Sequence, residues 1–420
     1  MKTKAVRLYA ANDLRLEEFD LPAIKEDEIL VKVITDSICM STYKAAIQGT
    51  KHKRVPPDID QNPIIIGHEF AGVIVEVGEQ WKDQFKPGEK FAIQPALNYK
   101  GSLYSPGYSY PFFGGAATYT VIPHEVMELG CLLPYSGEAF FQASLSEPMS
   151  CIIGAYHANY HTKPGCYEHE MGIKIGGKMA LLAGGGAMGL GAIDYAIHNT
   201  ERRPSMLVVT DVDDARLKRA ASLFNEKVAE EAGVKLYFVN TKELPNAEEY
   251  LMSLTDNTGF DDVYVYAPVT EVVEQADRIL ARDGCLNFFA GPVNPQFSAN
   301  LNFYNVHYTS THIVGTSGGN TDDMLECLKM TEQNLINPAV MVTHIGGINS
   351  VIDATMNLPK LPGGKKLIYN CLDMELTALE DFAQKGKENP HYAKLAELIE
   401  KHNGLWSAEA EKYLLENMSN

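Results

Sequence analysis

The sequence lacks any apolar stretch long enough to cross a bilayer, which requires about 20 consecutive apolar residues. Residues 1–20 break into charges before the apolar core of a secretory signal could form, so we expect a cytoplasmic protein with no membrane partner. The seven cysteines are odd in number and show no paired spacing. That pattern fits a reducing compartment and argues against a disulfide scaffold.

Basic residues are scarce relative to acidic ones. The 36 lysines and arginines against 54 aspartates and glutamates give a formal net charge of −18. Such a surface repels phosphate backbones and argues against a nucleic-acid partner, whereas a small anionic substrate needs only a local basic pocket. With 45% hydrophobic and 21% charged residues over 420 positions, the composition predicts a folded protein of two or three domains.

The chain divides into two differently patterned parts. Short β-type runs broken by glycine and proline, at 28–38, 70–78 and 88–95, predict a mostly antiparallel N-terminal domain. Residues 98–115, aromatic and rich in glycine and proline, predict a long irregular lobe. Strands and helices then alternate at 178–199, 206–224, 261–268, 269–284 and 285–292. This alternation predicts βαβ units and a parallel sheet, and the apolar spacing of 372–420 predicts an added helical tail.

Residues 184–189, Gly-Gly-Gly-Ala-Met-Gly, fit the G-x-G-x-x-G pattern between an apolar strand and a helix. Glycines there let the backbone approach a pyrophosphate at the helix N-terminus. Asp211 ends the next strand and would bind the ribose hydroxyls, which favours NAD(H); Arg216 nearby keeps NADP(H) open. The residues predicted to bind the cofactor are Gly184, Gly186, Met188, Gly189, Asp211 and Arg216.

Separated segments of the N-terminal part carry residue types that bind zinc. Cys39 ends a strand, His68 and Glu69 lie between two apolar runs, and Glu147 lies where a loop meets a helix. One thiolate, one imidazole and one carboxylate form an open zinc site. Taken singly, each residue also fits a structural role: a core thiol, a hydrogen-bonded turn residue or a helix cap.

Together these residues resemble the zinc-dependent medium-chain alcohol and polyol dehydrogenases, in order and spacing over about residues 1–370. The most specific pieces are GHEFAGVIVEVG, Ser146-Glu147-Pro148, and the glycine turn followed by Asp211. The resemblance implies an α/β protein with a GroES-like, mostly β catalytic domain and a Rossmann doubly wound parallel-sheet cofactor domain. The expected boundaries are 1–155 with 316–420, tail included, and 156–315. A homo-oligomer, dimer or tetramer, is a further family expectation.

By this resemblance, Cys39, His68 and a carboxylate bind one catalytic Zn²⁺. The carboxylate is either Glu147, or Glu69 with Glu147 holding the bound water. Ser41 would pass a proton to the alkoxide, and Lys44 stands where a histidine often ends the relay. The predicted catalytic residues are therefore Ser41, Lys44 and Glu69.

The chain departs from the family pattern in several places. Residues 92–120 contain no cysteine, so we expect no structural zinc, and Met40 and Thr42 replace the usual glycine and aspartate. Cys151 is a weaker competing ligand. A second group, His157, His161, Cys166 and His169, fits no zinc template.

The long lobe, the tail and the overall resemblance are most like the branch that interconverts L-sorbose 1-phosphate and D-glucitol 6-phosphate. A phosphorylated substrate needs a nearby cation, which the run Lys51, His52, Lys53 and Arg54, or Lys44, would supply. An NAD-dependent dehydrogenase of an unphosphorylated polyol, of the sorbitol or threonine dehydrogenase type, is the first alternative. A non-catalytic dinucleotide-binding relative is the second.

Overall fold

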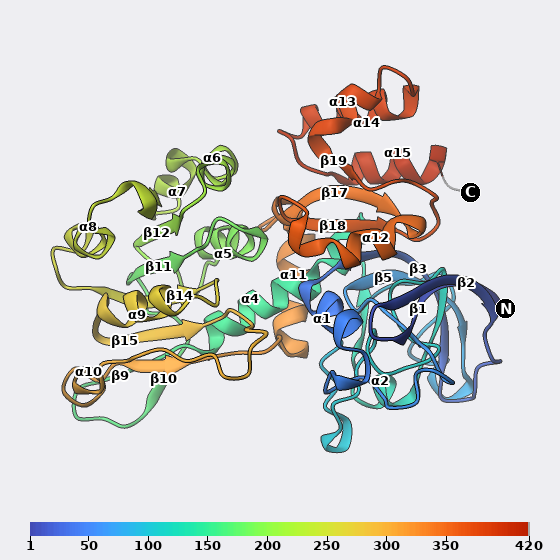
Figure 1. Ribbon diagram of the computed structural model, residues 1–420, viewed down its shortest axis with the longest axis horizontal. Helices are drawn as coiled ribbons and strands as arrows, with labels where there is room; N and C mark the ends of the chain where they lie inside the picture. Colours follow the sequence, from blue (N-terminus) through green and yellow to red (C-terminus); the bar gives the residue numbers. More distant parts are fainter. Residues whose placement is uncertain (419–420) are drawn as a thin grey trace. The chain divides into compact units, whose positions relative to one another are not determined.

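The computed structural model describes residues 1–418, which form two compact units (Figure 1). Unit 1 consists of Met1–Pro148, Asn320–Asn334 and the described chain from Met341 onward, and unit 2 of Met149–Gly319 and Leu335–Val340. Helix α4 (Ser146–Ala158) begins in unit 1 and continues into unit 2.

An eight-stranded sheet forms the body of unit 1. Its strands in spatial order are β19 (Thr377–Ala378), β17 (Val342–Gly347), β18 (Lys365–Tyr369), β3 (Ile29–Ile38), β5 (Phe70–Val77), β6 (Lys90–Ile93) and β8 (Leu132–Tyr135), with β7 (Tyr119–Ile122) also paired to β3. Every pairing except β17 with β18 is antiparallel. The predicted mostly antiparallel domain is confirmed.

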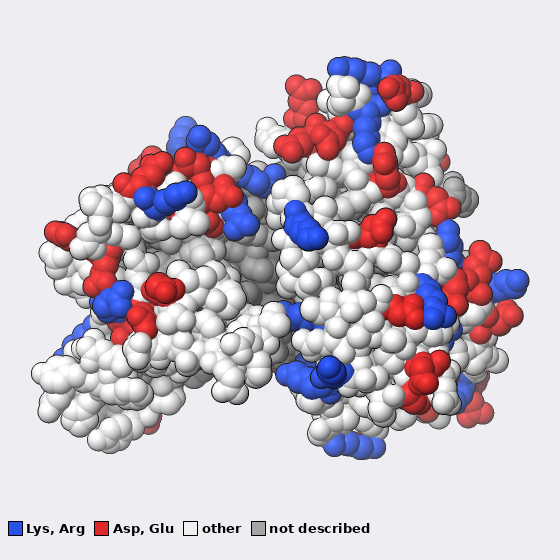
Figure 2. All heavy atoms as spheres, in the orientation of Figure 1, with Lys and Arg blue, Asp and Glu red and all other residues white. Residues whose placement is uncertain are grey.

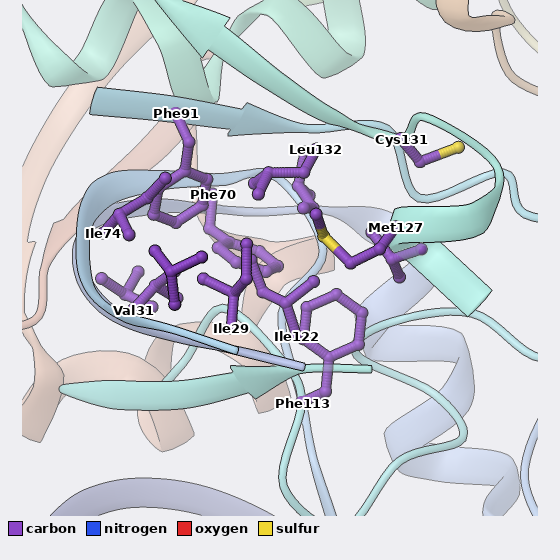
Figure 3. Packing of buried hydrophobic residues seen from close by; sticks show 14 of the residues in the cluster. Ile29, Val31, Phe70, Ile74, Phe91, Phe113, Ile122, Met127, Cys131 and Leu132 are labelled. Carbon is purple, nitrogen blue, oxygen red and sulfur yellow. The ribbon is translucent and has the colours of Figure 1, made fainter. Parts of the chain in front are cut away.

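The core of this sheet is built from apolar side chains of β3, β5, β6 and the segments that follow them (Figure 3). Val31, Phe70 and Phe91 are at most 1% exposed, and Phe113 packs edge-on against Phe70 at 5.8 Å between ring centroids. Burying each such side chain stabilises the fold by about 1.5–3 kcal/mol. The strands that carry the candidate site are therefore held in a rigid framework.

A smaller sheet and several short helices complete unit 1. The sheet has the order β2 (Asp13–Asp20), β1 (Lys2–Ala10) and β4 (Ile64–Ile65). The helices are α1 (Met40–Gln48), α2 (His124–Glu128), α3 (Phe140–Ser144), α11 (Thr321–Glu332) and α12 (Val351–Met356). The lobe at 98–115 contains only a 3-10 turn at Tyr99–Gly101, as the sequence predicted.

The C-terminal tail is helical after a short strand, β19. Helices α13 (Phe382–Lys385), α14 (Pro390–Lys401) and α15 (Ala408–Met418) lie beyond β17 and β19 in Figure 1. Glu411 of α15 accepts hydrogen bonds from the backbone N–H groups of Phe140 and Phe141, at 2.6 and 2.9 Å, and from the Tyr369 hydroxyl at 2.8 Å. These contacts attach the tail to α3 and β18.

A six-stranded, all-parallel sheet forms unit 2. Its order is β13 (Lys235–Asn240), β12 (Met206–Asp211), β11 (Lys178–Leu182), β14 (Phe260–Val265), β15 (Leu280–Phe288) and β16 (His312–Val314). The helices of this unit are α5 (Ala187–His198), α6 (Asp214–Leu223), α7 (Glu226–Glu231), α8 (Ala247–Leu254), α9 (Thr270–Arg278) and α10 (Phe303–Tyr308). This is the doubly wound order of a Rossmann sheet, as expected.

One boundary in unit 2 differs from the sequence prediction. The helix expected over 269–284 ends at Arg278, and β15 begins at Leu280 instead of residue 285. Asp283 has a left-handed backbone with φ of 61°, which an α-helix cannot contain. The charged residues of this segment are spaced like those on the polar face of a helix, and for this reason the sequence pattern predicted a longer helix.

A hairpin of β9 (Tyr160–Thr162) and β10 (His169–Met171) precedes the parallel sheet. Within residues 1–418, no helix combines the length and the apolar character needed to cross a membrane.

Candidate active site

Three of the four residues expected at a metal site, Cys39, His68 and Glu69, come from two loops of unit 1. Cys39 follows β3 directly and lies at the N-cap of α1. His68 and Glu69 form the loop before β5. Gly67 has a φ of 90°, and a Cβ there would lie 2.1 Å from Oδ2 of Asp36, so only glycine allows the loop to pass this close to β3.

The structure brings these side chains together. One potential ligand atom each from Cys39, His68 and Glu69 lies within 4.8 Å of the other two. His68 and Glu69 are 5% and 1% exposed, and Cys39 is half-buried. A thiol, an imidazole and a carboxylate that converge in this way match the donor set that Zn²⁺ prefers.

Two side chains of α1 orient the imidazole of His68. The Thr42 hydroxyl lies 3.3 Å from Nδ1, and the Ser41 hydroxyl lies 3.3 Å from Nε2 and donates to Cys39 Sγ at 3.0 Å. With Thr42 on Nδ1, Nε2 can serve as the ligand atom, an arrangement that is common around metal-binding histidines. Burial lowers the pKa of His68, so the ring is neutral, as metal binding requires.

Glu69 is held from two sides. One of its oxygens forms an ion pair with Lys365 of β18, and the other accepts a hydrogen bond from Ser37 of β3. Burial raises the pKa of Glu69, but the charge of Lys365 and the hydrogen bonds from Lys365 and Ser37 outweigh it and hold the net pKa below its ordinary value. The carboxylate is therefore ionised and fixed in orientation.

Glu147, on the first turn of α4, lies outside the group of atoms within 4.8 Å of one another. It is still close enough for its charge to act on His68. Burial and then the charge of Glu69 raise the pKa of Glu147 to about 7. A metal cation held by Cys39, His68 and Glu69 would oppose that shift.

The predicted relay residues lie on the same helix. Ser41 contacts both Cys39 and His68, whereas Lys44 follows one helical turn later and is half-buried. Burial lowers the pKa of Lys44, and the negative charge that Cys39 would carry as a thiolate opposes this effect. Ser41 thus touches the candidate ligands directly, and Lys44 adds a positive charge close to them.

The basic run at 51–54 is not uniform. Lys51 and Lys53 are exposed, whereas His52 and Arg54 are half-buried. The Arg54 guanidinium carbon lies 5.5 Å from the ring centroid of Tyr108. His52 stacks on the same ring at 5.5 Å with an interplanar angle of 11°. Burial lowers the pKa of His52 to about 4, so Arg54 is the cation of the run that lies against Tyr108.

Sequence reasoning missed Tyr108, Lys365 and Ser37. The Tyr108 hydroxyl lies 3.4 Å from Nε2 of His68, and its ring centroid lies 5.0 Å from the imidazole. No local signal separates Tyr108 from the other tyrosines of the lobe. Lys365 and Ser37 occupy ordinary strand positions, and only the sheet pairing brings them to Glu69.

The glycine turn of unit 2 has the expected geometry. Gly186 is the N-cap of α5, and a Cβ on Gly189 would lie 1.8 Å from the carbonyl oxygen of Gly184. Asp211, 4% exposed, accepts from the Gly185 N–H at 3.1 Å, and Arg216 lies 3.9 Å from the same carboxylate. Met188 is half-buried on the first turn of α5.

In the second histidine group, His161 and His169 make separate structural contacts and do not converge on one metal position. His161 is bonded to Oδ1 of Asp262 at 3.2 Å and to the Asp283 carbonyl at 2.9 Å, and His169 stacks on Tyr160 at 4.1 Å. Within residues 1–418, the donor group that converges closely enough for a metal is that of Cys39, His68 and Glu69.

Known proteins share both the fold and the sequence pattern. Residues 25–130 match the alcohol dehydrogenase GroES-like domain, and residues 187–333 match the zinc-binding dehydrogenase domain. The chain is 54% identical over 415 residues to mannitol-1-phosphate 5-dehydrogenase of Aliivibrio fischeri, covering 99% of this chain and 98% of the relative. It belongs to the zinc-dependent medium-chain alcohol and polyol dehydrogenases.

Two further similarities agree. L-sorbose 1-phosphate reductase of Klebsiella pneumoniae is 46% identical over 413 residues, covering 98% of this chain and 97% of the relative. A protein from Sinorhizobium meliloti described as a zinc-binding dehydrogenase, solved bound to NADP, shares the fold with a TM-score of 0.69 and 18% identity. It covers 88% of this chain and 100% of that structure. The protein is therefore a zinc-dependent oxidoreductase with a GroES-like and a Rossmann domain.

Proposed function

We propose that this enzyme uses NAD(P)H to reduce the keto group of a sugar phosphate, and catalyses the reverse oxidation of a polyol phosphate. The observation that carries the proposal is the position of Arg54, which lies over Tyr108 while the Tyr108 hydroxyl lies 3.4 Å from His68. A half-buried guanidinium this close to candidate zinc ligands suits a phosphate on the substrate. Both curated relatives described above are named for sugar phosphates.

Cys39, His68 and Glu69 would hold one Zn²⁺, which as a Lewis acid would polarise the substrate carbonyl. Glu147 would lie beside the position left open for substrate. Ser41 would exchange a proton with the substrate oxygen, with Lys44 supplying a positive charge along the same helix. Lys365 would keep Glu69 ionised and in place.

The glycine turn would hold the pyrophosphate of the cofactor at the N-terminus of α5. Asp211 would take the ribose hydroxyls, which favours NAD(H), while Arg216 beside it would tolerate the extra phosphate of NADP(H). We keep 156–315 as the proposed cofactor-binding domain and 1–155 with 316–420 as the proposed catalytic domain.

L-sorbose 1-phosphate is the substrate we favour. Its C2 keto group is next to the phosphorylated carbon. In the structure the Tyr108 ring contacts both His68 and Arg54, so the site suits a substrate whose keto group and phosphate are close together. Mannitol 1-phosphate is the second candidate because a relative named for it is 54% identical. That name places the reaction at carbon 5, far from the phosphate.

The test is a panel of ketose phosphates and their unphosphorylated counterparts, assayed with NADH and NADPH. The expected result is a much higher kcat/KM for a phosphorylated ketose, and an Arg54→Ala enzyme in which this preference collapses. Lys53→Ala is the matched control because Lys53 is exposed in the same run. Equal rates for free and phosphorylated ketoses would favour a dehydrogenase of unphosphorylated polyols instead. No turnover of any polyol by the zinc-loaded protein would favour a non-catalytic dinucleotide binder.

The expected homo-oligomer remains a proposal. Residues 284–319 of unit 2 contain no aspartate, glutamate, lysine or arginine, although the chain carries a net charge of −18. Within this segment Phe303, Tyr304 and Tyr308 of α10 are 73%, 66% and 58% exposed. Figure 2 shows mostly uncharged surface over the region of α10. Uncharged, aromatic surface is typical of subunit contacts, so we expect two copies to meet there.

A further inference from the structure

We propose that Tyr108 is the substrate-positioning residue of this site: its hydroxyl binds a substrate oxygen beside His68, and its ring fixes Arg54 for the phosphate. The inference rests on the proposed function and adds a specificity-determining residue to it. Tyr108 comes from the irregular lobe and was not among the residues expected from the sequence.

Contacts on both sides of Tyr108 fix the lobe at this position. The Ser109 hydroxyl donates to the backbone carbonyl of Arg54 at 2.7 Å, and the Ser105 hydroxyl donates to that of Pro95 at 2.8 Å. Gly107 has a φ of 78°, and a Cβ on it would lie 2.4 Å from the carbonyl oxygen of Gly67. The segment around Tyr108 is thus packed against the loop that carries His68 and tied to the residue that supplies the cation.

The ring of Tyr108 contacts both His68, a candidate metal ligand, and Arg54, the proposed phosphate-binding residue. His68 lies on one side, 5.0 Å between ring centroids, and His52 stacks at 5.5 Å. Arg54 lies 5.5 Å from the same centroid, within cation–π range. At only 4% exposed, Tyr108 has little freedom to move. The spacing between the reacting carbon and the phosphate is therefore set by one aromatic ring.

The hydroxyl of Tyr108 faces the candidate metal ligands. In the structure Oη lies 3.4 Å from Nε2 of His68. When Nε2 binds a metal, its lone pair is no longer available to accept this hydrogen bond. The buried hydroxyl keeps its interaction with the Ser41 hydroxyl and is free to donate to a further acceptor beside His68. A substrate oxygen next to His68 would supply it.

The experiment compares zinc-loaded Tyr108→Phe, Tyr108→Leu and wild-type enzymes. Tyr108→Phe keeps the ring and removes only the hydroxyl, so kcat/KM should fall about tenfold or more for both L-sorbose 1-phosphate and L-sorbose, leaving their ratio unchanged. Tyr108→Leu also removes the support for Arg54, so the ratio should fall towards that of Arg54→Ala. Calorimetric affinity for D-glucitol 6-phosphate, measured without cofactor, should fall more in Tyr108→Leu than in Tyr108→Phe.

Tyr110→Phe is the matched control. Tyr110 lies on the same lobe, but its hydroxyl donates to Glu125 of α2 at 2.8 Å and does not contact the candidate ligands. Its kinetics should equal those of the wild type. Zinc content and NADH affinity should be unchanged in all variants. An unchanged kcat/KM in Tyr108→Phe, or loss of zinc from that variant, would overturn the proposal.

Failure of the proposed function would be visible separately. If the wild type reduces only unphosphorylated ketones, the sugar-phosphate function and the role of Tyr108 towards Arg54 are both rejected. The hydroxyl role is still decided by Tyr108→Phe with whichever ketone the wild type reduces: a tenfold loss supports it, and full activity rejects it.

Discussion

Lys365 and Glu69 form a buried ion pair between β18 and the loop before β5, although 296 positions separate them in the sequence. Because the other oxygen of Glu69 accepts a hydrogen bond from Ser37, the carboxylate is oriented before any metal binds. The charge of Glu69 can then be balanced by the ammonium group of Lys365 or, in part, by a bound cation. If Lys365 is removed, a bound cation should therefore offset part of the lost stabilisation.

We expect Lys365→Met to destabilise the metal-free protein by about 3–5 kcal/mol, because Glu69 is left charged, buried and without its partner. Saturating Zn²⁺ should recover part of this loss. Urea unfolding in chelator and in Zn²⁺ measures both values. Lys82→Met, which breaks an exposed pair with Glu79, is the control and should cost less than about 1 kcal/mol. An equal loss with and without Zn²⁺ would contradict the shared balance.

The two carboxylates should behave differently when each is made neutral. Glu69→Gln should lose bound Zn²⁺, because Glu69 belongs to the group of atoms within 4.8 Å. Glu147→Gln should retain most of the metal but lose turnover, because Glu147 lies outside this group yet close enough for its charge to act on His68. Elemental analysis and kinetics of both variants check this, and the reverse order of metal loss would make Glu147 the ligand.

A pH effect is expected from Glu411, which fixes the tail. Burial raises its pKa from 4.5 to about 7, despite opposing hydrogen bonds from Phe141 and Tyr369. The folded state therefore binds the proton more tightly than the unfolded state, and stability falls as the pH rises from about 4.5 to about 7. Glu411→Gln should remove this part of the pH dependence, at most about 3 kcal/mol. Parallel stability curves for variant and wild type across this range would refute it.

The uncharged surface of unit 2 predicts how the chain associates. The Tyr304→Asp variant should be monomeric where the wild type is oligomeric, because the new charge would be buried in an aromatic contact without a partner. Light scattering coupled to size exclusion measures the mass. Leu129→Asp, at a 40% exposed position of unit 1, is the control and should leave the mass unchanged. A wild type that is monomeric at high concentration would exclude this contact.

What the sequence predicts well is what local spacing encodes. The glycine turn before α5 and the Gly67-His68-Glu69 loop follow from short patterns, and the structure shows the close backbone approaches that require these glycines. The parallel sheet follows from the alternation of strands and helices. The helix expected over 269–284 was partly wrong, since a polar pattern does not reveal the left-handed backbone of Asp283.

What the sequence does not predict depends on long-range pairing. Lys365 reaches Glu69 only because β18 pairs with β3, and Tyr108 reaches His68 only because an irregular lobe is tied to the loops beside it. Neither contact is encoded by a periodicity or a short motif in the sequence. Likewise, which lysine or arginine of 51–54 faces the site follows from burial in the folded protein and not from composition.

The central claim is that one metal ion held by Cys39 and His68 is required for hydride transfer but not for cofactor binding. The most direct measurement is zinc content, NADH affinity and ketose phosphate turnover in the wild type and in Cys39→Ala. We predict one zinc per wild-type chain, and a variant that binds NADH normally but holds no zinc and shows no turnover. Full turnover by the zinc-free variant would contradict the account.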